Sequence, residues 1–164
     1  MRRRIICGTV GLLFLAAAYP PLNHAQSDQV GGPILEFNTM FAVAGPYVGA
    51  TNPIRTVPGG GAPWAIGSGG GALWYNGQLS VHTQGLVVAA TGANPAAMFQ
   101  VIVSCQSIDG SGAADVVNVS TAPFPADANG NSLIDTTVDL PSPCIAPIVF
   151  VASTRGAWFA ATGR

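Results

Sequence analysis

The chain has 164 residues, of which 8% are charged, against about 25% in an average soluble domain. After the first 25 residues it contains three arginines, seven acidic residues and no lysine, a net charge of about −4, which argues against a nucleic-acid partner. Leu, Ile, Val and Phe make up 35 of those 139 residues, above the roughly 20% below which chains tend to stay disordered.

The N-terminus is typical of a secretory signal peptide spanning residues 1–25. Three arginines precede the apolar run Ile5–Leu15, which is followed by small residues and two prolines. This run is shorter than the roughly 20 residues that a spanning helix needs. We therefore expect no transmembrane anchor after cleavage, which we place after Ala25, with Ala18 as the alternative. The predicted location is secreted, periplasmic or cell-envelope.

Residues 26–33 are predicted to form a flexible tail, and residues 34–164 a single domain. Apolar residues alternate with polar ones, and no long window has helical spacing without Gly or Pro. The alternating faces are Leu35, Phe37, Phe41 and Val43; Phe99, Val101, Val103 and Cys105; and Ile134, Thr136, Val138 and Leu140. Shorter runs at 54–57, 64–66, 116–121, 148–152 and 157–162 bring the total to eight or nine short strands. This pattern predicts an all-β, antiparallel β-sandwich, immunoglobulin-like or jelly-roll-like.

The stretch "LWYNGQLSVHTQG" predicts a β-hairpin. Asn76-Gly77 between alternating residues favours a two-residue type I′ turn. That turn would pair Trp74 with Leu79 and bury Trp74, while Tyr75 and His82 would lie on the exposed face.

The stretch Asp127–Asp135, "DANGNSLID", partly resembles a calcium-binding loop because oxygen-bearing side chains recur along it. The glycine of the sharp turn and the final bidentate acid are missing, however. A hairpin turn at Asn129-Gly130 explains the stretch more simply. We predict no metal site and no cofactor, and leave weak calcium binding open.

Two cysteines, Cys105 and Cys144, remain after the predicted cleavage. In an exported protein such a pair favours a disulfide, and two buried free thiols are the alternative. A loop of this size is worth about 3 to 4 kcal/mol in the chain-entropy model.

Material for catalysis is scarce in the predicted mature chain. His82 is its single histidine, and Ser68 in "AIGSGG" lacks the glycine and the helix of a nucleophile elbow. No motif brings two of the acids together. We therefore predict no catalytic residues and no enzymatic activity.

The aromatic residues suggest a binding surface. Trp64 and Tyr75 flank the glycine-rich stretch "PGGGAPWAIGSGGG" and are possible ligand-stacking residues, because amphipathic aromatic rings are enriched where a protein contacts its ligands. Trp74 and Trp158 alternate with core-type residues and are predicted to be buried.

Six stretches carry a resemblance: "GGAPWAI", "NGQLSVHTQGLVV", "FQVIVSC", "NVSTAPFPA", "LPSPCIAPIVFV" and "GAWFAATG". Together, over about residues 58–163, they resemble a group of small exported bacterial proteins of unknown function. The resemblance implies export and supports the cysteine pair, but implies no activity or ligand.

The function expected from these features is that of a secreted, non-catalytic β-sandwich module with a binding or structural role. Its partner could be a glycan or an envelope protein. A secreted acid-dependent hydrolase, for example one acting on glycans, is the alternative. The two differ in whether reactive groups converge in a pocket.

Overall fold

The computed structural model describes residues 32–162. The predicted signal peptide, residues 1–25, and most of the predicted tail, residues 26–33, lie outside this range. Within it the chain forms twelve strands and one short 3-10 helix, Gly45–Tyr47. Three strands of two or three residues, Met40–Ala42, Val87–Val88 and Phe124–Pro125, are not predicted as separate strands, and the predicted run at 54–57 is a turn rather than a strand. No described helix has the length and apolar character needed to cross a membrane.

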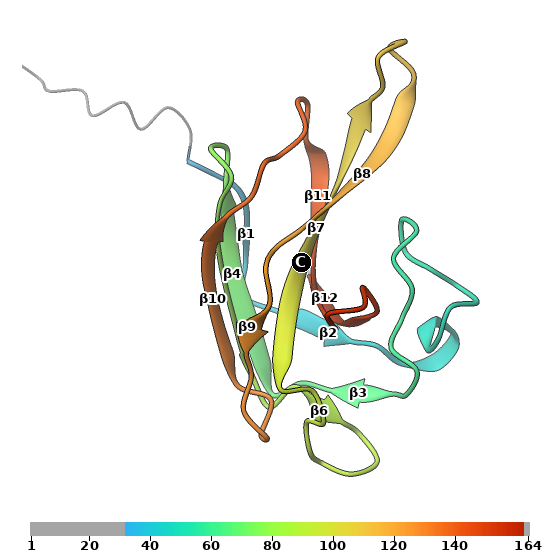
Figure 1. Ribbon diagram of the computed structural model, residues 1–164, viewed down its shortest axis with the longest axis vertical. Coiled ribbons are helices and arrows are strands. Elements are labelled where there is room, and N and C mark those ends of the chain that lie inside the picture. Colours follow the sequence, from blue (N-terminus) through green and yellow to red (C-terminus); the bar gives the residue numbers. More distant parts are fainter. Residues whose placement is uncertain (1–31, 163–164) are drawn as a thin grey trace, which may run out of the picture.

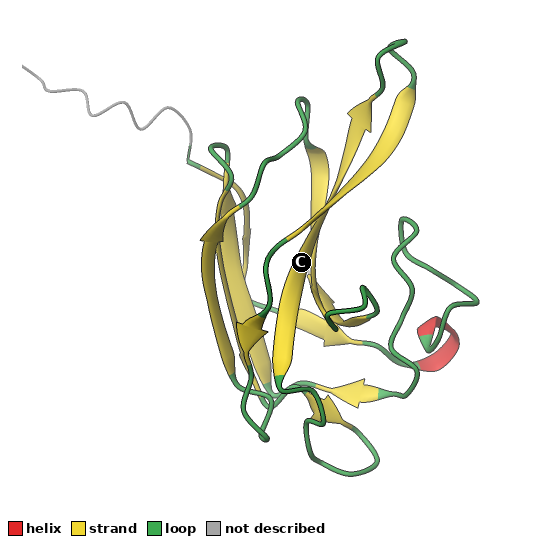
Figure 2. Cartoon of the chain, in the orientation of Figure 1, coloured by secondary structure: helices red, strands yellow, loops and turns green. Residues whose placement is uncertain are grey.

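Two antiparallel sheets pack face to face, so the predicted β-sandwich is confirmed (Figures 1 and 2). Sheet A runs in the order β1 (Pro33–Phe37), β4 (Ser68–Trp74), β5 (Gln78–Gln84) and β10 (Ser132–Thr137). Sheet B runs in the order β2 (Met40–Ala42), β12 (Trp158–Thr162), β11 (Ile145–Ala152), β7 (Met98–Ile108) and β8 (Ala114–Ser120), with β9 (Phe124–Pro125) also paired to β7. A small third sheet joins β3 (Trp64–Ala65) and β6 (Val87–Val88).

The core between the sheets follows the alternation seen in the sequence. On β7, Phe99, Val101, Val103 and Cys105 are fully buried. Ile134 on β10 is also buried, whereas the next residue, Asp135, is exposed. Burial of these apolar side chains is the main favourable contribution to folding.

A segment that spans residues 44–63 forms a third layer on the side of sheet B away from sheet A (Figure 1). It is held by backbone and side-chain hydrogen bonds: Trp158 N–H donates to Pro58 O at 2.9 Å, and Arg55 Nη1 donates to Ser104 O at 3.0 Å. This cover explains why β7 and β11 are buried on both faces: Phe150 and its pairing partner Ile102 are only 0% and 4% exposed.

The expected first strand is wrong in one respect. The chain leaves sheet A after Phe37 and enters sheet B at Met40. The crossing interrupts the alternation, so Met40 is buried and Phe41, predicted to face inward, is 68% exposed, whereas Val43 is buried as predicted. The period of a strand holds only while the chain stays in one sheet.

The hairpin between β4 and β5 is present, but its predicted turn and register are wrong. Only Gly77 has a positive φ, +84°, and its N–H donates to Trp74 O at 3.0 Å. The loop is therefore one residue longer than a type I′ turn, and Leu73 pairs with Leu79. A one-residue change of register moves every side chain to the other face. Leu73 is fully buried, and Trp74 lies on the outer face, only half-buried.

The backbone arrangement of a type I′ turn occurs instead at Arg55-Thr56, between the bridged residues Ile54 and Val57. Both central residues have positive φ, 47° and 68°, which is unusual for residues with a β-carbon. The Asn118 side chain on β8 donates to Arg55 O at 3.0 Å and to Thr56 Oγ1 at 2.9 Å. These bonds fasten the turn to sheet B.

The disulfide between Cys105 and Cys144 is confirmed, with Cα atoms 4.9 Å apart. It ties β7 to the residue that directly precedes β11. The two strands are neighbours in sheet B, and their register is irregular between Ile145 and Ile148. The bridge holds the first residues of β11 against β7 at this irregularity. It also suggests an oxidising compartment.

Candidate functional site

The outer face of sheet A has no covering segment among the described residues, whereas residues 44–63 cover part of the outer face of sheet B. The pairing of neighbouring strands places outward-facing side chains in rows that run across the outer face of sheet A. One row contains Glu36, Ala72, Ser80 and Asp135. Its members are polar or small, as expected for a solvated sheet face.

A trough runs along β4 on this face. Every second residue of β4 points outward, and these residues are Ser68, Gly70, Ala72 and Trp74. The small side chain of Ala72 leaves space above β4, whereas the His82 ring covers Gly70. The resulting hollow has a volume of about 630 Å³, within the usual range of ligand pockets.

The walls of the trough come from the two neighbouring strands. Glu36 and Asn38 lie on the β1 side, and Ser80 and His82 on the β5 side. At one end stands the half-buried ring of Trp74. The walls thus offer hydroxyl, amide, imidazole and carboxylate groups beside the apolar residues Trp74 and Phe37, and these polar groups can orient a ligand.

Gly70 fixes the position of the His82 side chain. A β-carbon at Gly70 would lie 2.9 Å from His82 Cε1, so the imidazole extends over β4. At the far end of the strand, Ser68 Oγ donates to Gln84 Oε1 at 3.2 Å. This pair lies beyond the hollow, which the His82 ring bounds opposite Trp74.

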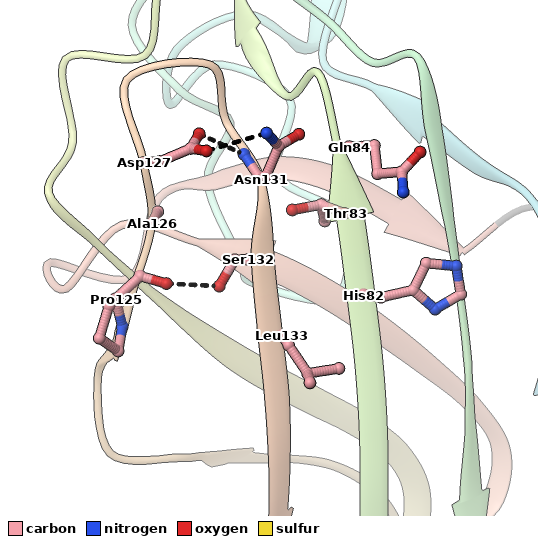
Figure 3. Close-up of a pocket in the computed structure, with 9 residues that line it drawn as sticks. All are labelled: His82, Thr83, Gln84, Pro125, Ala126, Asp127, Asn131, Ser132 and Leu133. Carbon is pink, nitrogen blue, oxygen red and sulfur yellow. Dashed lines mark hydrogen bonds between the residues drawn. The ribbon is translucent and has the colours of Figure 1, made fainter.

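A second, more open hollow of about 880 Å³ adjoins the first and shares His82 with it. Figure 3 shows its other wall, the turn that leads into β10. The imidazole of His82 points away from Asp127 in this view, and Ser132 Oγ donates to Pro125 O at 2.8 Å. Within residues 32–162, His82 makes no hydrogen bond to an acid or to a serine, the arrangement that would mark a hydrolase.

The Asp127 turn folds around its own carboxylate. The N–H groups of Asn129 and Asn131 donate to Oδ1, each at 2.9 Å, and Asn131 Nδ2 donates to Oδ2 at 2.9 Å. Asp135 lies apart on β10, paired with Ser80. The two acids therefore do not converge as calcium ligands. In the described part of the chain, no three His, Cys, Asp or Glu side chains are placed to hold a metal ion.

The expected hairpin at Asn129-Gly130 is also different in the structure. The turn connects β9, which pairs with β7 in sheet B, to β10, which pairs with β5 in sheet A. It is a crossing between sheets rather than a hairpin within one. The alternation on either side of the turn carries no information about which sheet each strand joins.

The donors around Asp127 predict a pH dependence. The backbone N–H and then the side-chain amide of Asn131 lower the pKa of the Asp127 carboxyl, because both bond to its charged form. A lowered folded-state pKa stabilises the fold above the unfolded-state value of about 3.9 and loses this effect as the pH falls through the folded-state pKa. We expect the melting temperature to fall below about pH 4, and to fall less in Asp127→Asn.

Thermal melts between acidic and neutral pH test this prediction. Asp139→Asn, at an exposed acid outside the turn, is the matched control and should leave the profile unchanged. An identical acid profile for Asp127→Asn and the native protein would contradict the assignment. Asp109 also contributes, because the Ser111 hydroxyl and the Ala113 and Ser111 N–H groups lower its pKa. The double variant should therefore flatten the profile further.

The acids on the outer face of sheet A are too far apart for concerted hydrolysis. Glu36 and Asp135 occupy one row and are separated by three strand-to-strand steps, which is about 14 Å at the usual strand spacing. Paired carboxyls in glycosidases lie about 5 to 9.5 Å apart. The row therefore supplies hydrogen-bonding groups rather than an acid and base acting on one bond.

The two predicted stacking residues have different positions. Trp64 is 6% exposed and stacks on Phe159, with ring centroids 3.9 Å apart, so its ring offers no free face to a ligand. Tyr75 is 68% exposed at the tip of the β4–β5 loop. It lines a separate pocket of about 250 Å³ together with Pro141 and Pro143.

Trp74 is the site residue that the sequence prediction missed. Leu73 and Trp74 are adjacent apolar residues, and either could be the inward-facing one in an alternating strand. The predicted two-residue turn pairs Trp74 with Leu79 and therefore places Trp74, rather than Leu73, in the core. A pairing of Leu73 with Leu79, two leucines on the core face, would have placed Trp74 on the outer face.

Comparisons of this chain with protein-family models, with curated proteins and with solved structures gave no match. What the described residues define is an antiparallel β-sandwich with a disulfide between Cys105 and Cys144.

Proposed function

We propose that the protein is an exported, non-catalytic β-sandwich module that binds its ligand in the trough on the outer face of sheet A. The observation that carries this proposal is the half-buried Trp74 at the end of a trough that is otherwise lined by small and polar residues and by the buried Phe37. An amphipathic ring in such a place binds ligands at low entropic cost. The disulfide and the signal-like N-terminus support export to the cell envelope or beyond it.

The hydrolase alternative receives less support. Its acids would have to converge, and Glu36 and Asp135 stand on opposite edges of sheet A. A structural role without any ligand remains the simpler competitor, and binding measurements separate the two.

Trp74→Ala is the direct test. The full-length gene is expressed with its own leader in an exporting host, and the purified protein is titrated by calorimetry against defined glycans and envelope polymers. We expect Trp74→Ala to weaken binding at least about tenfold, the effect of losing about 1.4 kcal/mol. Phe41→Ala is the matched control, because Phe41 is an exposed aromatic residue on sheet B. It should bind like the native protein.

Three outcomes would contradict the proposal. One is binding that Trp74→Ala leaves intact. A second is binding lost equally in Phe41→Ala. The third is cleavage of a bound glycan that stops in Glu36→Gln or Asp135→Asn, which would establish the hydrolase instead.

A further inference from the structure

The shape of the trough indicates an extended ligand. The hollow follows β4 from the His82 ring, which lies over Gly70, to Trp74, and at about 3.3 Å per residue these four steps measure about 13 Å. Its sides are the neighbouring strands β1 and β5. A linear chain lying along β4 would contact the whole floor, whereas a compact ligand would use only a part of it.

The hydrogen-bonding groups indicate a ligand rich in hydroxyls. The carboxylate of Glu36 only accepts hydrogen bonds, while Asn38, Ser80 and His82 both donate and accept. These groups lie on both sides of the trough. A ligand that presents donors and acceptors along its length, and an apolar ring face to Trp74, meets all of them. A sugar chain has this combination, and a purely apolar ligand does not.

The charges around the trough indicate that the ligand is electrically neutral. Glu36 lines the trough and Asp135 lies in the same row. The arginines of the described residues are elsewhere: Arg55 is bonded to Ser104 O beyond sheet B, and Arg155 lies in the turn between β11 and β12. An anionic polymer would meet carboxylates here without a compensating cation, and like-charge contacts count strongly against a partner.

We infer that the trough binds a neutral linear polysaccharide laid along β4, with one sugar ring stacked on Trp74. This inference rests on the proposed function and adds the class of ligand. It also assigns Ala72 as a specificity-determining position, because its small side chain leaves the space that the sugar chain occupies, and Gly70 as the position over which the His82 ring lies.

The test uses neutral and anionic oligosaccharides of matched length as probes: β-1,4-linked glucose and N-acetylglucosamine hexamers against an oligouronate. Calorimetry of the exported protein should show binding to one or both neutral hexamers, tighter than to the corresponding dimers, and at least tenfold weaker binding of the oligouronate. Ala72→Leu should abolish binding by filling the trough. Ala114→Leu, the same change at an exposed position on β8, should not affect it.

Tryptophan fluorescence supplies a readout that does not depend on the folding of a variant. Trp64 and Trp158 are 6% and 4% exposed, so acrylamide should quench mainly Trp74. The neutral hexamer should protect this fluorescence. In Gly70→Ala, where the His82 ring must move, protection should require higher hexamer concentrations.

The outcomes separate the two levels of the proposal. Trp74-dependent binding of the oligouronate in preference to the neutral hexamers would overturn the ligand class and leave the binding function standing. Failure of every probe to protect Trp74 would overturn the ligand class as well. If envelope polymers also gave no binding that depended on Trp74, the proposed function itself would be wrong.

Discussion

Replacing both bridged cysteines, Cys105 and Cys144, with alanine should lower the free energy of unfolding by about 4 kcal/mol. The bridge closes a loop with a sequence separation of 39 residues, and removing it restores about that much chain entropy to the unfolded state. Alanine is preferable to serine because Cys105 is fully buried, and a buried hydroxyl would add its own cost.

Urea denaturation of the double variant measures the effect, and denaturation of the native protein with and without reductant gives an independent value. The two should agree to within about 1 kcal/mol, because both remove the same constraint. Intact mass before and after reduction checks the bridge and locates signal cleavage at Ala25 or Ala18. A midpoint that neither treatment changes would contradict a stabilising role for the disulfide.

Gly130→Ala should cost about 3 kcal/mol, combining about 1 to 2 kcal/mol for a left-handed conformation with the cost of overpacking. Gly130 has φ +75°, and an added β-carbon would overlap the backbone carbonyl and nitrogen of Leu86. The turn cannot move away easily, because Gly130 O accepts hydrogen bonds from Leu86 N at 3.2 Å and from Thr83 Oγ1 at 3.1 Å.

Gly92→Ala is the matched control for this prediction. Gly92 also has a positive φ, +65°, but a β-carbon there would contact nothing within 4 Å. It should therefore cost only the conformational part, about 1 to 2 kcal/mol. Equal losses in the two variants, measured by urea denaturation, would show that the contact with Leu86 has no effect of its own.

Parts of the fold could be predicted because local pattern and tertiary burial agree there. The alternation at Phe99, Val101, Val103 and Cys105 specifies the inward face of β7 correctly, since a strand that stays in one sheet keeps its period. The disulfide followed from counting cysteines in an exported chain. Both predictions rest on rules that do not depend on the details of the turns.

The remaining features depend on contacts between distant parts of the chain. Nothing local in "EFNTMF" shows that the strand changes sheets between Phe37 and Met40. The loop at Asn76-Gly77 is held by a bond that the hairpin alone does not contain, from Val138 N to Gly77 O at 2.9 Å. A β-carbon at Gly77 would overlap Val138 O.

The error in the predicted turn also caused an error in the predicted site. A shift of one residue moved Trp74 from the predicted core to the outer face of sheet A, and Trp64, a predicted ligand-stacking residue, became part of the core. Composition could identify aromatic residues as candidates for binding. Deciding which of them meets a ligand required the register of β4 and β5 and the packing of Trp64 on Phe159.

The cover formed by residues 44–63 has a consequence for how this protein can evolve. It gives sheet B two apolar layers, the sandwich core and the layer that includes Phe150 and Ile102, whereas polar outward residues of sheet A lie outside both layers. Substitutions at positions such as Ser80 or Asn38 can therefore accumulate with small effects on stability. Descendants of this sequence could diverge in what they recognise while inheriting the same scaffold.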